Sequence, residues 1–300
     1  MDGVLVVDKP LGPTSHDVVA KVRKLIGVRR IGHTGTLDPL ATGVLPLVVG
    51  RATRLASLLS STAKTYVADV RFGAATRTYD ADPRFGASEE PPAEPEGLTR
   101  QIVEGALAEF SGVISQVPPA FSAKKIAGVP AYKRARRNED VTPAPVEVTV
   151  HAIALEHYAA GLARIRLVTS AGFYVRTFAH DLGQRLGCGA HLAGLRRTRA
   201  GDFTLQEAVT LEDLERNRAS AAGYLVPLER LLPDLPGVRL TDRGIKRASH
   251  GNTIAPADVA EPVEGWSTGK ARLLDSAGSR LLGIAESHGN GLLHPVIVLV

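Results

Sequence analysis

Apolar and polar side chains alternate along several stretches of the chain, which is the pattern of a strand with one buried face. In Tyr66–Phe72, the aromatic and small apolar side chains occupy every second position. Val146–Leu155 and Leu162–Thr169 are further predicted strands, and Gly3–Val7 is a β-branched run that Lys9-Pro10 brings to an end. The pattern therefore predicts strands spread over the first 170 residues.

Three other stretches have apolar positions at helical spacing. Thr14 is a typical N-cap with Asp17 three residues later, and Gly27 ends the helix that follows. A second helix is predicted over 99–111 and a third over 177–186. The predicted apolar faces are Val18, Val22 and Leu25 in the first helix, Ile102, Ala106 and Phe110 in the second, and Phe178, Leu182 and Leu186 in the third.

The composition and the spacing of apolar residues change after Pro227. A short span that contains Pro227, Pro233 and Pro236 is typical of a linker. The residues after it, 237–300, form short apolar stretches separated by Gly, Pro, Ser and Asn. We therefore predict two domains, 1–232 and 237–300, of which the second is small and β-rich. The segment 77–97 has no periodicity and collects proline and acidic residues, which predicts a surface loop.

Composition excludes several classes of protein. The 300 residues are 44% hydrophobic and 22% charged, as in a folded protein with a substantial core. The single cysteine, Cys188, excludes an internal disulfide framework and a multi-cysteine metal site. The apolar run Val44–Val49 is far shorter than the ~20 residues of a membrane span, and the N-terminus lacks the pattern of a signal peptide. These observations predict a cytoplasmic protein.

The net charge of +5 is unevenly distributed. Three stretches, 18–37, 122–138 and 185–199, are basic, whereas 80–96 is acidic. Each basic stretch alone is as well explained by a solvated helix face, but three in one chain indicate a surface that follows a phosphate backbone. Their cations are Lys21, Arg23, Lys24, Arg29 and Arg30, then Lys124, Lys125, Lys133, Arg134, Arg136 and Arg137, and finally Arg185, Arg196, Arg197 and Arg199.

The most unusual segment of the chain is 32–43, which reads GHTGTLDPLATG. It lacks the Gly-Lys-Ser/Thr of a phosphate loop and the three spaced glycines of a dinucleotide site. Gly32 and Gly35 allow a close approach of the backbone to a ligand, and Pro39 favours an extended Asp38. An Asp-Pro turn is more often structural than catalytic, so local chemistry alone does not assign Asp38 a role.

With three further residues, this segment becomes GHTGTLDPLATGVLP, which resembles the signature of the TruB family of tRNA pseudouridine synthases. Other segments resemble the family in the same order, and the likeness extends over residues 3–215. They are Asp8-Lys9-Pro10, Thr14-Ser15, Lys64-Thr65-Tyr66, Tyr174-Val175-Arg176-Thr177, Gly187–His191 and Leu195-Arg196-Arg197, together with Pro118–Arg137, which resembles a basic RNA-gripping insertion.

The resemblance implies that the chain converts the T-loop uridine at tRNA position 55 to pseudouridine. It implies an α+β fold with a mixed, mainly antiparallel sheet flanked by helices, followed by a small PUA-like RNA-binding domain. Asp38 would be the catalytic aspartate, Arg176 its ionic partner, and Tyr66 the aromatic that packs on the target base. The other implied substrate positions are Tyr174 beside the arginine, Leu195 in the pocket wall, His33 in the space that the flipped uridine vacates, and Lys9 at the pocket edge. The backbone of the RNA would lie on Lys124, Lys125, Lys133, Arg134, Arg136 and Arg137.

The residue chemistry agrees with this activity. Isomerisation breaks an N-glycosidic bond and rejoins the base through carbon without net redox change, so we expect neither a cofactor nor a metal. A carboxylate in a dry pocket needs a cationic partner to stay ionised, and stacking that is lost on base flipping is recovered on an aromatic side chain at ~1–3 kcal/mol. Asp38 has three open roles, namely addition to the sugar, addition to the base, and removal of a sugar proton.

Alternative interpretations remain for several residues. Tyr66 alone is equally a sheet-packing residue, Arg176 alone a surface residue, and His180-Asp181 has no partner pair that would make it a metal site. Cys188 and His191 lie in a glycine-rich turn and are expected to be structural. A non-catalytic RNA-binding protein and an RNA-guided synthase are the competing functions. The presence of the implied catalytic residues disfavours the first, and the lack of long basic tails disfavours the second. We therefore expect a standalone, monomeric enzyme whose partner is tRNA.

Overall fold

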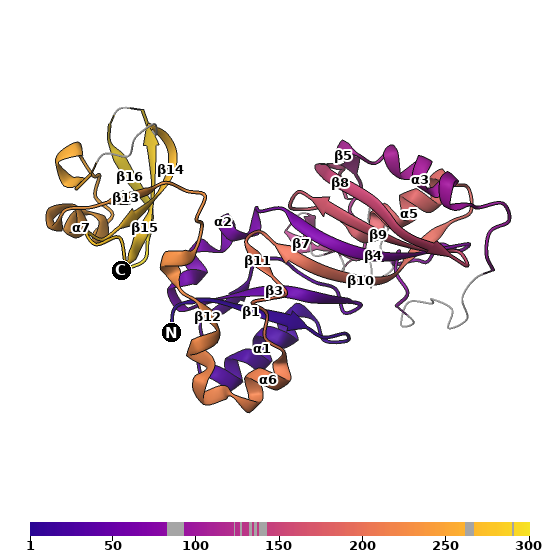
Figure 1. Ribbon diagram of the computed structural model, residues 1–300, viewed down its shortest axis with the longest axis horizontal. Helices are drawn as coiled ribbons and strands as arrows, with labels where there is room; N and C mark the ends of the chain where they lie inside the picture. Colours follow the sequence, from indigo (N-terminus) through magenta and orange to yellow (C-terminus); the bar gives the residue numbers. More distant parts are fainter. Residues whose placement is uncertain are drawn as a thin grey trace.

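The computed structural model describes residues 1–82, 93–122, 124–126, 128–131, 134, 137, 143–261, 267–289 and 291–300, with backbone only at 125, 126, 129 and 130. Within this part of the chain, a ten-stranded and a four-stranded sheet mark two units, which we call the large unit (1–232) and the small unit (237–300) (Figure 1). The small unit lies at one end of the molecule, next to the N-terminus.

The large sheet contains β1 (Gly3–Lys9), β2 (Ile31–His33), β3 (Ala41–Val49), β4 (Lys64–Phe72), β5 (Gly112–Gln116), β8 (Val146–Ala159), β9 (Leu162–Thr169), β10 (Ala190–Ala200), β11 (Phe203–Thr204) and β12 (Leu225–Val226). β6 (Lys125–Ile126) and β7 (Val129–Pro130) pair separately as a hairpin. Among its described residues, the large unit has the helices α1 (Ser15–Ile26), α2 (Ala56–Ser60), α3 (Arg100–Ala108), α5 (Val175–Arg185) and α6 (Leu211–Arg216), with 3-10 turns η1 (Gly50–Leu55), η3 (Arg218–Tyr224) and η4 (Leu228–Arg230).

The order of the strands brings distant parts of the sequence together. The main path is β12-β1-β3-β10-β4-β9-β8-β5, in which β3 and β10 are parallel and the other neighbours are antiparallel. This confirms the predicted α+β fold with a mixed, mainly antiparallel sheet. At Gly43 (φ 100°), an added Cβ would lie 2.2 Å from the carbonyl oxygen of Arg197, so glycine lets β3 approach β10 closely.

The local patterns produce several of the predicted elements. β4 alternates buried and less buried residues along its whole length. The Thr14 side chain accepts a hydrogen bond from the Asp17 amide, the Asp17 carboxylate accepts one from the Thr14 amide, and Gly27 ends α1 at φ 69°. The predicted strand at Leu162–Thr169 is β9 without change of bounds.

Other elements differ from the prediction. α3 ends at Ala108 rather than near Gly112, and Ile102, which we placed on its buried face, is 48% exposed. The buried face is instead formed by Val103, Ala106 and Leu107. The helix is therefore rotated relative to the prediction, so that position 103 and not position 102 faces the sheet. β8 extends four residues beyond its predicted end, to Ala159, and β10 was not predicted from the sequence.

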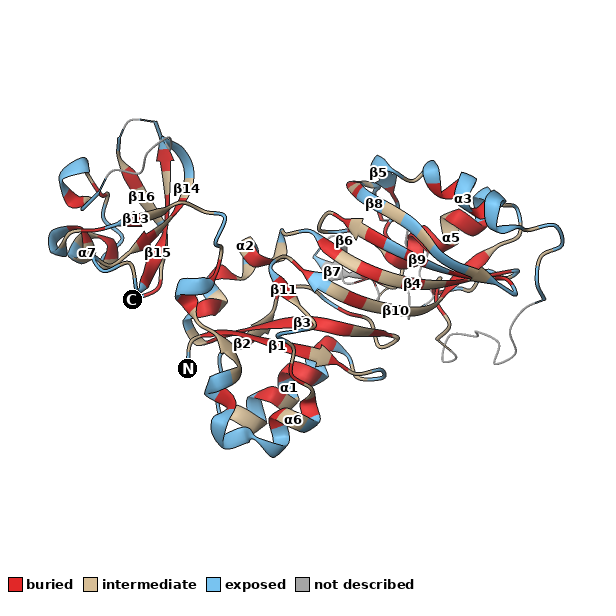
Figure 2. Cartoon of the chain, in the orientation of Figure 1, coloured by how far each residue is buried: buried red, intermediate tan, exposed pale blue. Residues whose placement is uncertain are grey.

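Helices cover different faces of the two halves of the sheet (Figure 2). α3 and α5 pack on β4, β8 and β9, where Phe72, Ile165 and Phe178 are fully buried. α1 and α6 pack on one face of β1 and β3, and η1, α2 and η4 cover the other face of the same strands. The central part of the sheet, where these layers meet, carries the site described below.

The small unit is β-rich, as predicted, and contains β13 (Gly237–Arg239), α7 (Asp242–Ser249), η5 (Pro256–Asp258), β14 (Thr268–Leu274), β15 (Leu281–His288) and β16 (Leu293–Val298). It shares a core with the large unit, because Ile284 and Leu299 belong to the same apolar cluster as Val4 and Leu55. Arg51 Nη1 also donates to the Leu299 carbonyl at 2.8 Å. No helix in the described ranges is long and apolar enough to cross a membrane.

Candidate active site

A cavity of about 280 Å³ opens in the large unit between the segment 34–38, β4, β10 and the start of α5. Of the seven residues that we expected to be catalytic or substrate-binding, five line it, namely Asp38, Tyr66, Tyr174, Arg176 and Leu195. They come from four segments that are far apart in the sequence. The sheet order explains their meeting, because β10 lies between β3, which follows Asp38, and β4, which carries Tyr66.

Asp38 and Arg176 form an ion pair in this cavity. Arg176 Nε lies 2.8 Å from Asp38 Oδ2, and the arginine side chain is 8% exposed whereas the aspartate side chain is 40% exposed. The other guanidinium nitrogens donate to the carbonyl oxygens of Thr78 at 3.1 Å and Phe121 at 2.9 Å. Arg176 is therefore held at three points, so the carboxylate beside it has a fixed direction.

A second carboxylate lies behind the same arginine. Asp80 Oδ2 is 3.8 Å from Arg176 Nε, and Asp80 is buried. Burial raises the pKa of Asp80, which the Thr78 hydroxyl and the Arg176 charge partly oppose. Asp80 was not among the predicted site residues, because we assigned it to the acidic surface loop 77–97. Residues 83–92 of that loop lie outside the part that the structure describes.

Hydrogen bonds from Ser15 and Lys9 to the backbone hold the loop that carries Asp38; we call them the clamp. Ser15 Oγ accepts from the Leu37 amide at 2.8 Å and donates to the Leu37 carbonyl at 3.0 Å. On the other side of Asp38, Lys9 Nζ donates to the Ala41 carbonyl at 2.7 Å. The start of α1 and the end of β1 therefore determine where the catalytic candidate points.

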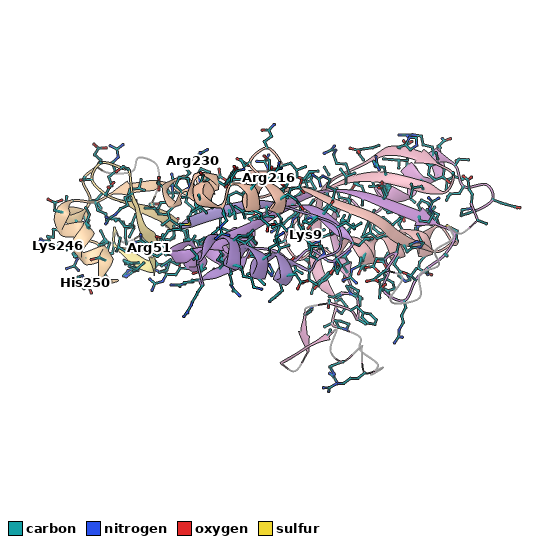
Figure 3. All side chains as sticks on the ribbon, turned by 90° about the horizontal axis from the view of Figure 1, so that it is seen from below. Lys9, Arg51, Arg216, Arg230, Lys246 and His250 are labelled. Carbon is teal, nitrogen blue, oxygen red and sulfur yellow. The ribbon has the colours of Figure 1, made fainter. Side chains whose placement is uncertain are left out.

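Lys9 supports this loop from within the protein rather than lining the pocket edge. Figure 3 shows it inside the large unit, and its side chain is fully buried. Burial lowers the pKa of Lys9 to about 8, and the charge of Arg197 acts in the same direction whereas that of Asp38 opposes it. Lys9 therefore acts on the cavity through the backbone that it holds.

Removing the hydroxyl of Ser15 tests whether the clamp positions Asp38. In Ser15→Ala, both hydrogen bonds to Leu37 are lost, so the loop gains freedom next to the reacting group. We expect the single-turnover rate constant on substrate to fall about 10- to 100-fold, since small displacements at a reacting group have effects of that size. Substrate affinity should stay unchanged in a binding titration. A Ser15→Ala protein that reacts at the wild-type rate would show that the clamp is dispensable.

His33 lies outside the cavity, at the end of β2. Its ring makes an edge-to-face contact with His16, with 5.6 Å between ring centroids. Burial lowers the pKa of His33, assisted by the charges of His16 and Arg197, and its Nδ1 is buried with no hydrogen-bond partner among the described residues. A neutral imidazole is the form that this environment favours.

The third basic stretch contains paired, buried and exposed arginines. Arg185 pairs with Glu109, Arg196 pairs with Asp8 at 2.7 Å, and Arg197 is 1% exposed. Arg196 and Arg197 lie on β10, a central strand, whereas Arg185 ends α5 and Arg199 is exposed. The burial of Arg197 was not predicted, because charge alone does not distinguish a solvated arginine from a paired or buried one.

The second basic stretch is described only in part. Lys133 and Arg136, together with the side chain of Lys125, lie outside the described residues. Lys124 Nζ donates to the Ala144 carbonyl at 3.1 Å, and Arg137 is exposed. The hairpin of β6 and β7 stands out from the body of the large unit (Figure 3). The Arg137 amide donates a hydrogen bond to the Arg134 carbonyl, which closes a turn.

Two cavity residues that the sequence analysis did not select are Lys64 and Arg197. Lys64 is on the same strand face as Tyr66, two residues earlier, so the alternation in β4 was a usable signal. Arg197 lies directly opposite Tyr66 in the pairing of β10 with β4, and its Nε donates to the Val44 carbonyl at 2.7 Å. No cluster of three or more metal-ligating side chains occurs within the described ranges.

Comparisons with known proteins identify the family. A family model described as "TruB family pseudouridylate synthase (N terminal domain)" matches residues 23–175, just over half of the chain. The chain belongs to the TruB family. A second model, "tRNA pseudouridylate synthase B C-terminal domain", matches residues 176–233. The Asp38 loop and Tyr66 fall in the first match, and Arg176 and Leu195 fall in the second.

Relatives within the TruB family span the whole chain. A "tRNA pseudouridine synthase B" from Solibacter usitatus is 43% identical over 100% of both chains, and one from Thermobifida fusca is 41% identical over 99% of this chain and 98% of its own. A solved Cbf5-Nop10-Gar1 complex contains a chain that is 26% identical, with a TM-score of 0.77 over 99% of this chain and 85% of that one. An H/ACA RNP bound to a substrate RNA that contains 2'-deoxyuridine has a chain of the same fold, with 24% identity and a TM-score of 0.75 over 99% of this chain and 85% of that one.

Proposed function

We propose that the protein isomerises uridine to pseudouridine at position 55 in the T-loop of tRNA, with Asp38 as its catalytic residue. The observation that carries this proposal is the Asp38–Arg176 ion pair in the wall of a cavity that Tyr66 also lines, in a chain of the TruB family. The cavity volume of about 280 Å³ lies at the lower end of small-molecule sites, as a site for one nucleoside should.

The target uridine must leave its stack in the T-loop before it can reach Asp38. We assign Tyr66 the stacking contact with the flipped base, because its ring is in the cavity wall and belongs to the rigid centre of the sheet. Tyr174 and Leu195 supply the neighbouring walls. Burial raises the pKa of Tyr174, so its hydroxyl stays protonated at neutral pH.

The reaction then breaks the C1′–N1 bond and forms a C1′–C5 bond. Asp38 acts at this stage by adding to the sugar, by adding to the base, or by removing a sugar proton, and Arg176 holds the carboxylate in the required direction in each case. The C5 proton is lost and N1 gains a proton, so the reaction is an isomerisation without net redox change. No step calls for a group that the chain does not provide.

The rest of the molecule supplies the surface for the RNA. We assign the phosphate contacts of tRNA to the basic stretch 122–138, whose hairpin stands out from the large unit. The small unit, 237–300, is proposed as a PUA-like RNA-binding domain that follows a catalytic domain at 1–232. In this scheme the protein works as a monomer without an obligate protein partner, in the cytoplasm, where tRNA is processed.

Tritium release tests the proposed function directly. A tRNA transcript with 5-tritiated uridine loses one tritium for each uridine that is isomerised, because C5 loses its hydrogen. We expect the purified protein to release one tritium per tRNA and to release none from a transcript with cytidine at position 55. Tight binding of tRNA without any release would instead support the non-catalytic RNA-binding protein.

Neutralising the basic stretch tests its contact with RNA. In the variant with glutamine in place of Lys133, Arg134, Arg136 and Arg137, we expect weaker tRNA binding. The plot of the logarithm of the binding constant against the logarithm of the salt concentration should also be shallower, by about 0.9 for each lost phosphate contact if the RNA duplex has the charge density of DNA. Binding measured at several salt concentrations gives the slope. Glutamine at Arg166 and Arg164, on the face of the sheet away from the cavity, is the control. A slope equal to that of wild type would refute the assignment.

A further inference from the structure

The cavity contains more positive charge than the Asp38–Arg176 pair accounts for. Its ionisable walls include three cations, Lys64, Arg176 and Arg197, but one carboxylate, Asp38. Arg176 is matched by Asp38 and Asp80. Within the described residues, no carboxylate lies within 4.0 Å of Lys64 or Arg197. Two buried cations without an ionic partner are costly, so an unmatched pair at a reacting site calls for a functional reason.

These two cations lie deep in the cavity. Lys64 and Arg197 are buried, whereas the Asp38 side chain is 40% exposed, so Asp38 is nearer the mouth. Lys64 Nζ donates to the carbonyls of Ser60 and Thr62, which uses two of its three N–H groups. A flipped nucleotide enters base first because its phosphates stay with the RNA strand. The uracil ring, rather than a phosphate, therefore meets the deep end of the cavity.

Arg197 connects this deep end to the aromatic wall. Its guanidinium donates to the carbonyls of Val44 and of Gly35, the latter at 3.0 Å, and the Tyr66 hydroxyl forms a further hydrogen bond with it. An added Cβ at Gly35 would lie 3.3 Å from Arg197 Nη1, so the loop before Asp38 is packed directly on the arginine. The charge is thereby fixed in place before substrate arrives, which is what electrostatic catalysis requires.

The chemistry of the reaction supplies the missing negative charge. When the C1′–N1 bond breaks, its electron pair goes to N1 and is shared with O2 and O4 of the ring. If Asp38 first adds to the base, the ring becomes negative through O4 instead, so all three roles of Asp38 place an electron pair on uracil. The pair then forms the C1′–C5 bond, the C5 proton leaves, and N1 takes up a proton.

We propose that Lys64 and Arg197 form a cationic floor that stabilises the negative charge on the uracil ring during the isomerisation. This inference rests on the proposed function. Burial, assisted by the charge of Arg197, lowers the pKa of Lys64 to about 8, so most of the floor's charge is present at pH 7 and the charge of Lys64 is lost as the pH rises through about 8. The titratable groups that share the cavity are Asp38, Tyr66, Tyr174, Arg176 and Arg197, with Lys9 behind the loop.

Single-turnover tritium release from saturated enzyme, between pH 6.5 and 9.5, tests the floor. In Lys64→Met we expect the rate constant at pH 7 to fall about 100-fold or more, with tRNA affinity unchanged, because the charge acts on the reacting ring. In Lys64→Arg we expect most of the rate to return, and the decline that wild type shows above pH 8 to disappear, since arginine stays charged. Arg166→Met, on the next strand and the opposite face, removes a cation without effect on the rate.

Three results would overturn the inference. The first is a wild-type rate in Lys64→Met. The second is a failure of Lys64→Arg to restore the rate in a protein that melts like wild type. The third is a decline of the rate above pH 8 that persists in Lys64→Arg, which would assign the titrating group to Lys9 instead of Lys64. If Lys64→Met does not fold, the pH profile of Lys64→Arg decides alone. A wild-type protein that releases no tritium from any tRNA refutes the proposed function itself and the floor with it, so the two failures are distinguishable.

Discussion

In Asp38→Asn, we expect pseudouridine formation to fall by at least about 1000-fold, because an amide can act neither as the nucleophile nor as the base in any of the three roles of Asp38. Asparagine has nearly the same shape, and its carbonyl oxygen still accepts from Arg176. The loop stays clamped by Ser15 and Lys9, which contact its backbone and not the carboxylate. We therefore expect the folded state and tRNA affinity to be retained, so the loss should lie in the single-turnover rate constant.

A matched carboxylate replacement serves as the control for Asp38. Asp69 is on β4, the strand of Tyr66, but faces away from the cavity and pairs with Arg164. Asp69→Asn should react at the wild-type rate, since surface ion pairs contribute little. If Asp38→Asn retained a rate within tenfold of Asp69→Asn while still binding tRNA, Asp38 would not be the catalytic residue.

Arg176→Met should be the most destabilising single change in the site. It removes one buried cation that faces Asp38 and Asp80, and it leaves the carbonyls of Thr78 and Phe121 without their donor. Breaking a buried ion pair costs ~3–5 kcal/mol, so we expect a loss of about 3 kcal/mol in the free energy of unfolding, together with a loss of activity comparable to that of Asp38→Asn. Arg176→Lys keeps the charge but cannot reach all of these partners, so its stability and activity should lie between those of wild type and Arg176→Met.

The stability deficit of Arg176→Met should depend on pH. The pKa of Asp80 is already raised by burial in the folded protein, and the charge of Arg176 opposes that rise, so its removal raises the pKa of Asp80 further. A carboxyl with a raised pKa binds its proton more readily in the folded state, which makes stability fall as pH rises through that range. Urea unfolding should therefore show a larger deficit at pH 7 than at pH 5. Equal deficits at the two pH values would contradict the role of Asp80.

Local sequence signals predicted the elements that depend on neighbouring residues. The cap of α1 needs Thr14 and Asp17 alone, and the burial pattern of β4 follows from alternation, so both were predictable from short windows. The same signals failed for β10, whose three arginines and single glycine resemble an exposed segment. Its central place depends on contacts with β3 and β4, which are more than 100 residues away in sequence and leave no local pattern.

The candidate site shows the same division. The motif around Asp38 and the resemblance to the TruB family selected the residues that line the mouth and walls of the cavity. Arg197 escaped because a buried arginine and a solvated one have the same sequence signal, and its burial depends on carbonyls of Gly35 and Val44. Asp80 escaped because it begins an acidic stretch, where a single functional carboxylate is not distinguishable by composition.

Mapping pseudouridine at nucleotide resolution in a treated tRNA transcript shows which uridine is isomerised and whether Asp38 is required. Carbodiimide labelling marks pseudouridine, and reverse transcription then stops one nucleotide before the labelled position. We predict a stop that reports position 55 after incubation with wild-type protein, no stop at any other uridine, and no stop after incubation with Asp38→Asn. A stop at a different uridine, or an equally strong stop at position 55 with Asp38→Asn, would contradict the account of a T-loop uridine isomerised at Asp38.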